Sequence, residues 1–188
     1  MNVFDFDNTL YKGESSFDFA LFMIKNKKRL ILYLPRFVFL LFLYKICVLK
    51  PANFKKRLEK LMSVFLKNKE FTLSCIHEFW LYHIDKLDTN MLKLIKSNDV
   101  ISTASPSFLI DDLKDVLNTD HIISTQIDLE KGKISVLNFH NNKVKTFKQY
   151  YPNTKIQTFY TDSYNDKPLM HIAQSVYLVK KGKLKKIK

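Results

Sequence analysis

The spacing of apolar residues divides this chain into three stretches, and that division constrains the fold more than any other feature. Residues 2–10 begin with one short apolar run, which predicts a single buried strand. Between residues 16 and 96 the apolar residues recur every three or four positions, which predicts four or five helices and no strand. After residue 98 short apolar runs alternate with helical patterns, as in a parallel sheet.

The third stretch supplies most of the predicted sheet. Ser105 and Pro106 favour a helix that starts there, with Ser as N-cap and Pro at the first helical position. A second helix is expected from Asn141 to about Tyr151, and a turn at residues 130–133 predicts a β-hairpin. The strands are expected at residues 100–103, 122–127, 156–160 and 176–179.

The first strand belongs with these later strands, because the stretch between them is predicted to be all helical. The sequence therefore predicts an α/β fold: a doubly wound parallel sheet with an inserted all-helical cap domain. We assign residues 1–11 and 98–188 to the α/β core and residues 12–97 to the cap. Breaks between the inserted helices are expected at residues 26–28, 50–53, 67–69 and 87–90.

Composition narrows the class of protein. A chain of 188 residues that is 46% hydrophobic and 14% aromatic is neither disordered nor collagen-like, and it can bury a substantial core. Cys47 and Cys75 are isolated thiols, and the N-terminus carries no basic and apolar leader. Both features predict a cytoplasmic protein in a reducing compartment.

The basic residues outnumber the acidic ones by 31 to 18, which gives a net charge of +13 and suggests an anionic partner. Only three of the 31 are Arg, whereas bidentate recognition of phosphates and base edges favours Arg, so nucleic-acid binding is not favoured. Six lysines fall within the last nine residues, where we expect a solvated tail.

Residues 30–49 are strongly apolar, but Pro35, Arg36 and Lys45 interrupt them. A membrane-spanning helix needs about 20 predominantly apolar residues, so a span is not expected. Two interpretations remain. Buried cap helices broken at Pro35 are favoured, because a helix that is apolar all round is usually core. The alternative is an interfacial hairpin that lies on anionic lipid, in peripheral contact with a membrane.

A pair of acids follows the first predicted strand. The period of two along a strand sends Asp5 and Asp7 to the same side, and Thr9 follows at the same spacing. The carboxyl end of a strand is where α/β sheets place ligands. Two carboxylates there can hold Mg²⁺, attack phosphorus and transfer a proton.

Three later segments carry residues suited to the same chemistry. The strand at residues 100–103 ends in hydroxyl side chains, which can donate to an anion or simply cap a helix. Lys143 can neutralise a phosphoryl group. Asp162 directly follows an apolar strand and can complete a magnesium site, while Asp166 can cap the next helix or orient a lysine.

The order of these motifs resembles that of the haloacid dehalogenase superfamily of Mg²⁺-dependent phosphotransferases, and within it the phosphoserine-phosphatase-like branch. The resemblance covers residues 2–179. It implies that Asp5 is the nucleophile that becomes an aspartyl-phosphate. It also implies that Asp7 is the general acid and base and that Thr9 is a structural support.

The resemblance assigns roles to the later motifs as well. The phosphoryl-binding hydroxyl would be Thr103, with Ser102 as a second register, and Lys143 would bind the same group although Asn replaces the glycine often found just upstream. Asp162 would bind Mg²⁺ together with Asp5 and the backbone carbonyl of Asp7. Asp166 would hold Lys143 or the waters of the metal, and the helical insertion would be the cap over the site.

The substrate is less constrained. Glu14 and Arg57 resemble the residues with which phosphoserine phosphatases bind the amino and carboxylate groups of serine. The glycines of that branch are absent beside Thr103 and around Asp162, so a serine substrate is not carried over. We expect a small-molecule or lipid-linked phosphomonoester.

Two other functions stay open. One is a membrane-surface phosphatase that acts on a lipid phosphate, and the other is a catalytically silent scaffold that binds polyanions. The five His residues show no metal-ligand spacing, and no P-loop, GxGxxG or GxSxG motif occurs. The charge of +13 motivates the scaffold, whereas the complete set of acids, hydroxyl and lysine favours an enzyme.

Overall fold

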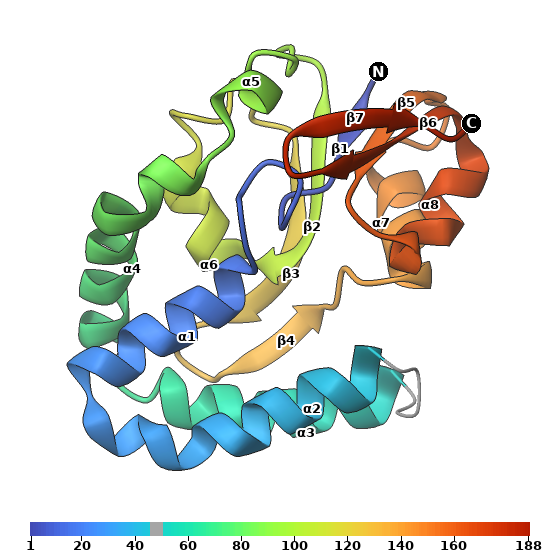
Figure 1. Cartoon of the computed structure of the whole chain (residues 1–188). Helices are drawn as coiled ribbons and strands as arrows, with labels where there is room; N and C mark the ends of the chain where they lie inside the picture. The colour runs from blue at the N-terminus through green and yellow to red at the C-terminus, as the bar shows by residue number, and fades with distance from the viewer. Residues whose placement is uncertain (46–50) are drawn as a thin grey trace.

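The computed structural model describes residues 1–45 and 51–188. Cys47, Lys50 and the start of the break predicted at residues 50–53 lie outside these residues. Within them, one seven-stranded sheet has the order β4-β3-β2-β1-β5-β6-β7, parallel except for β4 and β7 at its edges (Figure 1). The strands are β1 Val3–Phe4, β2 Val100–Pro106, β3 Ile122–Asp128, β4 Lys133–Val136, β5 Ile156–Thr161, β6 Ala173–Lys180 and β7 Lys183–Lys186.

Helices cover both faces of this sheet, so the predicted α/β class is confirmed (Figure 1). The later helices are α6 Ser107–Ile110, α7 Asn141–Tyr150 and α8 Lys167–Ile172, with short 3-10 turns η3 Asp111–Leu113 and η4 Tyr164–Asp166. The stretch between β1 and β2 holds α1 Ser15–Asn26, η1 Lys28–Tyr33, α2 Leu34–Lys45, α3 Pro51–Phe65, α4 Lys69–His83, η2 Ile84–Lys86 and α5 Thr89–Leu92.

The central strands build one hydrophobic core on each face. Val3 and Val100 contribute to the cluster under α7 and α8, whereas the next residues, Phe4 and Ile101, contribute to the cluster under the other helices. This alternation follows from the period of two along a strand. Buried apolar residues on both faces explain why these strands read as short, continuous apolar runs.

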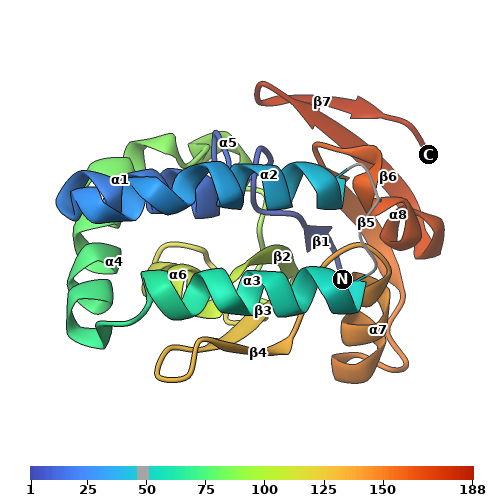
Figure 2. The same cartoon turned by 90° about the horizontal axis from the view of Figure 1, so that it is seen from below.

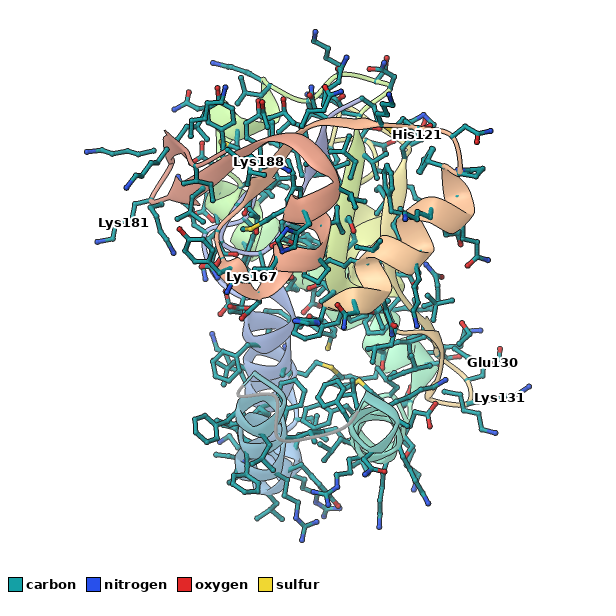
Figure 3. All side chains as sticks on the ribbon, turned by 90° about the vertical axis from the view of Figure 1, so that its right-hand side faces the viewer. His121, Glu130, Lys131, Lys167, Lys181 and Lys188 are labelled. Atoms are coloured by element: carbon teal, nitrogen blue, oxygen red, sulfur yellow. The ribbon has the colours of Figure 1, made fainter. Side chains whose placement is uncertain are left out.

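Each predicted strand is present, and the predicted hairpin is β3–β4, with Glu130 and Lys131 at its tip (Figure 3). The helix predicted at Ser105 starts later, because β2 continues through Pro106, which pairs with Thr125 of β3. The N-cap residue of α6 is therefore Pro106, and the predicted capping role of Ser105 is wrong. The Ser105 side chain is free to contact other polar groups.

The lysine-rich C-terminus is a strand and not a solvated tail, so that prediction is wrong. β7 pairs antiparallel with β6, and every β7 side chain is exposed. The left-handed turn between the two strands uses Lys181 and Gly182, at φ values of 51° and 74°. Figure 3 shows Lys181 pointing away from the sheet at this turn. Backbone pairing is compatible with charged side chains here because the strand lies at the edge of the sheet.

The inserted stretch is helical, as predicted, and the breaks at residues 26–28, 67–69 and 87–90 fall between helices. Trp80 of α4 contacts Phe6 and Tyr11 in edge-to-face geometry and donates from Nε1 to the Leu109 carbonyl at 2.7 Å. This helix therefore shares one hydrophobic core with the sheet. The division into a core and a separate cap stays a prediction.

The apolar segment at residues 30–49 is only partly buried in its described portion. Pro35 lies in the first turn of α2, directly after η1, so the predicted break is present. Phe37 and Leu40 are buried, but Ile31 and Leu32 are exposed. The prediction of fully buried helices is therefore wrong for the outer face of this segment. No helix in residues 1–45 or 51–188 is long and apolar enough to cross a membrane.

Candidate active site

The two acids of the first motif lie where β1 ends, between its neighbours β2 and β5. The Asp5 N–H donates to the Tyr160 carbonyl at 2.8 Å, which continues the ladder of β1 with β5 by one residue. The chain then turns through Asn8, whose φ of 56° is in the left-handed region that Asn tolerates. Parallel strands on both sides of β1 make this edge a topological switch point, the usual ligand site of such sheets.

Lys143 joins Asp5 to Asp166 inside the protein. Its Nζ lies 2.9 Å from Asp5 Oδ1 and 2.9 Å from Asp166 Oδ2, and its side chain is only 3% exposed. Thr161 donates a further hydrogen bond to Asp166 Oδ2 at 3.3 Å. Asp5 and Lys143 are 138 positions apart in the chain, and Lys143 and Asp166 are 23 positions apart. The fold brings these three residues together, as the motif order predicted.

Burial and charge oppose each other in this cluster. Burial raises the pKa of Asp5 well above its ordinary value, the Lys143 charge lowers it, and Asp166 and Asp162 raise it further. For Lys143 burial acts to lower the pKa, but Asp166 and Asp5 reverse the direction, and the net pKa is raised. A buried lysine held between two carboxylates stays protonated, because losing the proton would leave two buried acids facing each other.

Asp7 lies beside this cluster with different partners. Its Oδ1 accepts from the Ser15 N–H at 2.6 Å, and its Oδ2 accepts from the Ser105 hydroxyl at 2.7 Å. Burial raises the pKa of Asp7 to about 6, with the Glu14 charge adding to this and the hydrogen bonds from Ser15 and Ser105 opposing it. A carboxyl with such a pKa can both give and take a proton near neutral pH.

Ser15 and Ser105 were not predicted as partners of Asp7. The Ser105 hydroxyl lies 2.9 Å from the hydroxyls of both Ser15 and Ser16, so three serines from α1 and β2 surround the second acid. The signal in the sequence was weak, since Ser105 also fitted an N-cap. Only the extension of β2 through Pro106 directs its side chain to Asp7.

The hydroxyl side chains of Ser102 and Thr103 in β2 are fully buried, and this part of the strand is bound by Asn138, a residue not predicted as part of the site. The Thr103 hydroxyl accepts from the Ser105 N–H at 3.0 Å, and Ser102 contacts Asn138 Nδ2 at 3.3 Å. Asn138 Nδ2 also donates to the carbonyls of Thr103 and Ile123, and its Oδ1 accepts from Thr146. Asn138 therefore fastens β2 and β3 to the helix that carries Lys143. No spacing rule points to it.

The acids at the ends of β1 and β5 suit a magnesium ion in number and kind. Asp162 follows β5 directly, and its negative charge raises the pKa of Asp5. Mg²⁺ usually takes one or two carboxylates and fills its other positions with water and substrate phosphate. Two carboxylates that repel each other fit that pattern. In the part of the chain that the structure describes, no three His, Cys, Asp or Glu side chains form a metal site by themselves.

Three further predicted residues occupy different surroundings. Thr9 is buried, and its Oγ1 has no hydrogen-bond partner among the described residues. Glu14 accepts a hydrogen bond from Asn8 Nδ2 at 3.0 Å. Its negative charge acts on the site by raising the pKa of Asp7. Arg57 is exposed and lies with Arg36 and Lys60 around a hollow on the outer side of α2 and α3. The structure does not bring Arg57 to the acids.

A cavity of about 460 Å³ opens beside Asp7. Asp7, Glu14, Ser16 and Ser105 form its polar end. The rest of the wall comes from α1, α2, α3 and the strands, and it includes eight of the 16 phenylalanines of the chain. None of the described residues that line it is Lys or Arg. The site thus combines a polar, charged centre with an apolar chamber.

The fold and this set of residues define a hydrolase of the haloacid dehalogenase type. A family model of haloacid dehalogenase-like hydrolases matches residues 3–171, and the chain belongs to this family. No curated protein matches the chain. The predicted resemblance to the haloacid dehalogenase superfamily is confirmed.

Solved structures share the fold at low sequence identity. A protein of unknown function from Bordetella pertussis Tohama I has a TM-score of 0.76 at 20% identity, over 91% of this chain and 85% of that one. A phosphoserine phosphohydrolase-like protein from Francisella tularensis subsp. tularensis SCHU S4 has a TM-score of 0.60 at 18% identity, over 94% and 86%. A phosphoserine phosphatase solved as a phospho-aspartyl intermediate analogue has a TM-score of 0.60 at 17% identity, over 93% and 83%.

Proposed function

We propose that the protein hydrolyses a phosphomonoester in two steps through an aspartyl-phosphate on Asp5. The observation that carries the proposal is the position of Lys143 Nζ, 2.9 Å from both Asp5 and Asp166, beside an acid whose pKa is raised to about 6. A nucleophile, a buried cation and a proton-transfer group are the parts that phosphoryl transfer requires.

In the first step a carboxylate oxygen of Asp5 bonds to phosphorus, and the bond from phosphorus to the ester oxygen breaks. Asp7 gives its proton to that oxygen, so the product is a neutral alcohol. In the second step a water attacks the aspartyl-phosphate, Asp7 takes a proton from the water, and inorganic phosphate leaves with Asp5 restored. The raised pKa of Asp7 suits both proton transfers.

The other residues would position the phosphoryl group. Lys143 offsets its negative charge, and the Thr103 hydroxyl or the backbone N–H groups after β2 would donate to its oxygens. Asp166 fixes Lys143 by an ion pair. Thr9 would act as the structural support that the family resemblance implies.

The residues that would hold Mg²⁺ are Asp5, Asp162 and the backbone carbonyl of Asp7. A bound Mg²⁺ would neutralise charge on the phosphoryl oxygens. Residues 12–97 would act as the cap that closes over the site and excludes water. The predicted contact between Arg57 and a substrate carboxylate is not part of this proposal, because Arg57 lies outside the cavity beside Asp7.

Phosphate release tests the proposal. The purified chain is incubated with serine, sugar, nucleotide and lipid phosphates, in Mg²⁺ and in EDTA. We expect Mg²⁺-dependent release that Asp5→Asn abolishes and that Asp111→Asn, which changes an exposed acid of η3, leaves intact. Retained activity in Asp5→Asn would contradict the nucleophile. The absence of release from every ester by the folded protein would contradict the function.

A second candidate function, contact with a membrane surface, has an observation of its own. Between residues 19 and 58 the sequence has ten Lys or Arg and no Asp or Glu. Ile31 and Leu32 of this stretch are 55% and 75% exposed. Arg36 and Arg57, together with the nearby Lys60, surround the outer hollow of α2 and α3. Exposed aliphatic side chains among cations suit the surface of an anionic bilayer.

Vesicle sedimentation tests this contact. We expect binding to phosphatidylcholine vesicles only when they also contain phosphatidylglycerol, with a loss at high salt. Leu32→Glu should weaken binding by about tenfold, because it places a carboxylate at the bilayer surface. Leu81→Glu is the matched control, since Leu81 is 66% exposed on α4. Equal effects of the two substitutions, or binding that ignores lipid charge, would contradict the candidate.

A further inference from the structure

We infer that the substrate carries its phosphate on a hydrophobic organic group, and that this group occupies the cavity beside Asp7. The inference rests on the proposed function, because it concerns the leaving group of that reaction.

The position of the cavity identifies the part of the substrate that enters it. Asp7, the proposed proton donor to the leaving oxygen, lies at the polar end of the cavity together with Ser105. Asp5 and Lys143 are not among the residues that line it. With phosphorus at Asp5 and the ester oxygen at Asp7, the organic group attached to that oxygen continues into the cavity.

The wall of the cavity is apolar over most of its extent. Of the 24 residues that form it 18 are apolar, and the polar ones are Asp7, Glu14, Ser16, Ser105, Thr125 and Asn165. Its volume of about 460 Å³ falls within the range of roughly 300–1,000 Å³ that is usual for small-molecule sites. In a cavity of this kind, each substrate methylene that is removed from water makes the free energy of binding more favourable.

The same wall disfavours a small charged leaving group such as serine. A carboxylate placed there would meet two acids, Asp7 and Glu14, and no cation among the described lining residues. An unpaired charge in apolar surroundings is costly. Arg57, the residue expected to pair with such a carboxylate, lies on the outer side of α3. Figure 2 shows α2 and α3 running alongside each other in front of the sheet.

The helices α1, α2 and α3 form this chamber because each turns one apolar stripe toward the strands. Phe19 and Met23 come from α1, Phe37 from α2, and Phe54 and Phe65 from α3, and all five are buried. The chamber is completed by Leu137 and Phe139, between β4 and α7, which carries Lys143. Segments that approach the catalytic lysine and segments of the helical insertion thus enclose the same space.

A homologous series of n-alkyl phosphates, from ethyl to decyl, tests the inference. We expect kcat/KM to rise by about fourfold for each added methylene until the cavity is full, which corresponds to about 0.8 kcal/mol per CH₂. Phosphoserine should be a poor substrate. Binding of the same series to Asp5→Asn, measured by calorimetry, should show the same increments without turnover.

Two phenylalanines of α2 make a matched pair for this experiment. Phe42 lines the cavity and is 56% exposed, whereas Phe39 is 59% exposed and does not line it. We expect Phe42→Ala to reduce kcat/KM for the longer esters by about tenfold, while Phe39→Ala leaves kcat/KM unchanged across the series. Val38→Trp, which fills part of the chamber from a half-exposed position, should shorten the optimal chain.

The outcomes separate this inference from the proposed function. Hydrolysis of ethyl phosphate that depends on Asp5, with no gain from longer chains, would overturn the inference and leave the function standing. An absence of hydrolysis throughout, together with binding that strengthens with chain length, would overturn the function and keep the cavity as a site for hydrophobic phosphate esters. Equal effects of Phe42→Ala and Phe39→Ala would also overturn the inference.

Discussion

The two walls of the proposed site are built on different principles. The wall formed by the ends of β1, β2 and β5 is polar. Its charged side chains are held by ion pairs, as in the contacts of Lys143 with Asp5 and Asp166. The wall formed by α1, α2 and α3 is apolar, and its buried side chains pack into the main hydrophobic core. The first wall suits one chemical step, whereas the second selects for size and hydrophobicity.

The difference predicts how each wall responds to substitution. A buried ion pair that loses one partner leaves an uncompensated charge, so the polar wall should be intolerant. An apolar wall loses contacts in proportion to the atoms removed, so its responses should be graded.

Lys143→Met should have the largest effect. It leaves Asp5 and Asp166 buried without their cation, and we expect the free energy of unfolding to fall by about 3–5 kcal/mol at neutral pH. Phosphate release should fall by at least about a thousandfold. Urea unfolding and phosphate release measure the two effects.

Lys86→Met is the control for this prediction. Lys86 Nζ lies 2.9 Å from Asp18, but its side chain is 38% exposed, so we expect a loss of less than about 1 kcal/mol. If both substitutions cost the same, the charges at the end of β1 are not buried as described, and the contrast between the two walls fails.

Asn138→Ala should have the next largest effect. The substitution removes the donor to the carbonyls of Thr103 and Ile123 and the acceptor for Thr146, all of them buried. Unsatisfied buried groups cost about 1–3 kcal/mol each, so we expect a loss of roughly 2–4 kcal/mol in the free energy of unfolding. Asn26→Ala, which removes an exposed bond to the Phe22 carbonyl, should change stability by less than about 0.5 kcal/mol.

A loss as small as that of Asn26→Ala would show that water replaces the Asn138 side chain. In that case the link between β2 and α7 would not depend on this residue. Thermal and urea unfolding of the two variants decide between these outcomes.

Asp7→Asn should stabilise the protein, and only above about pH 4. The pKa of Asp7 rises from 3.8 to about 6 on folding, so both states are protonated at low pH and the wild-type loses stability as pH rises through that interval. One pKa unit corresponds to about 1.4 kcal/mol, and Asp7 is only partly buried, so we expect a gain of about 2 kcal/mol at pH 7.

The measurement is urea unfolding of the metal-free protein between pH 4 and pH 8. Turnover should be lost in Asp7→Asn although stability increases. A stability difference that does not change with pH would mean that burial does not shift the Asp7 pKa, and Asp111→Asn supplies the exposed reference.

The same contrast explains what the sequence could predict. The strands and the acids that follow them were predictable because a short apolar run and its polar end are local signals, as in Asp5 and Asp162. The contact of Ser105 with Asp7 was not, because it depends on how far β2 continues. Nor was the chamber, since spacing shows that a helix has an apolar stripe but not which neighbour the stripe meets.

Two other misses have the same origin. The charged side chains of the β7 lysines are typical of a solvated tail. The strand forms nevertheless, because its backbone pairs with β6. Asn138 looks like a turn residue before a helix, whereas its amide meets carbonyls of two strands. In each case the deciding partner is distant in sequence.

Thr9→Val should have the smallest effect, and its sign is informative. The Thr9 hydroxyl is buried without a partner among the described residues, and Val has nearly the same shape. Removing an unsatisfied buried hydroxyl should therefore stabilise the protein by about 1 kcal/mol, while Thr9→Ser, which keeps the hydroxyl and loses the methyl, should destabilise it by about as much.

Chemical unfolding of the two Thr9 variants measures this directly. If Val destabilises and Ser does not, the hydroxyl has a partner that supports the turn after Asp7, and the polar wall is satisfied throughout. If Thr9→Val stabilises the protein, the Thr9 hydroxyl is a polar group that folding does not require. It lies in the same motif as Asp5 and Asp7. The polar wall would then contain at least one residue that lowers the free energy of unfolding. No such residue is expected in the apolar wall, because a buried apolar side chain that lines the cavity also stabilises the folded protein by packing.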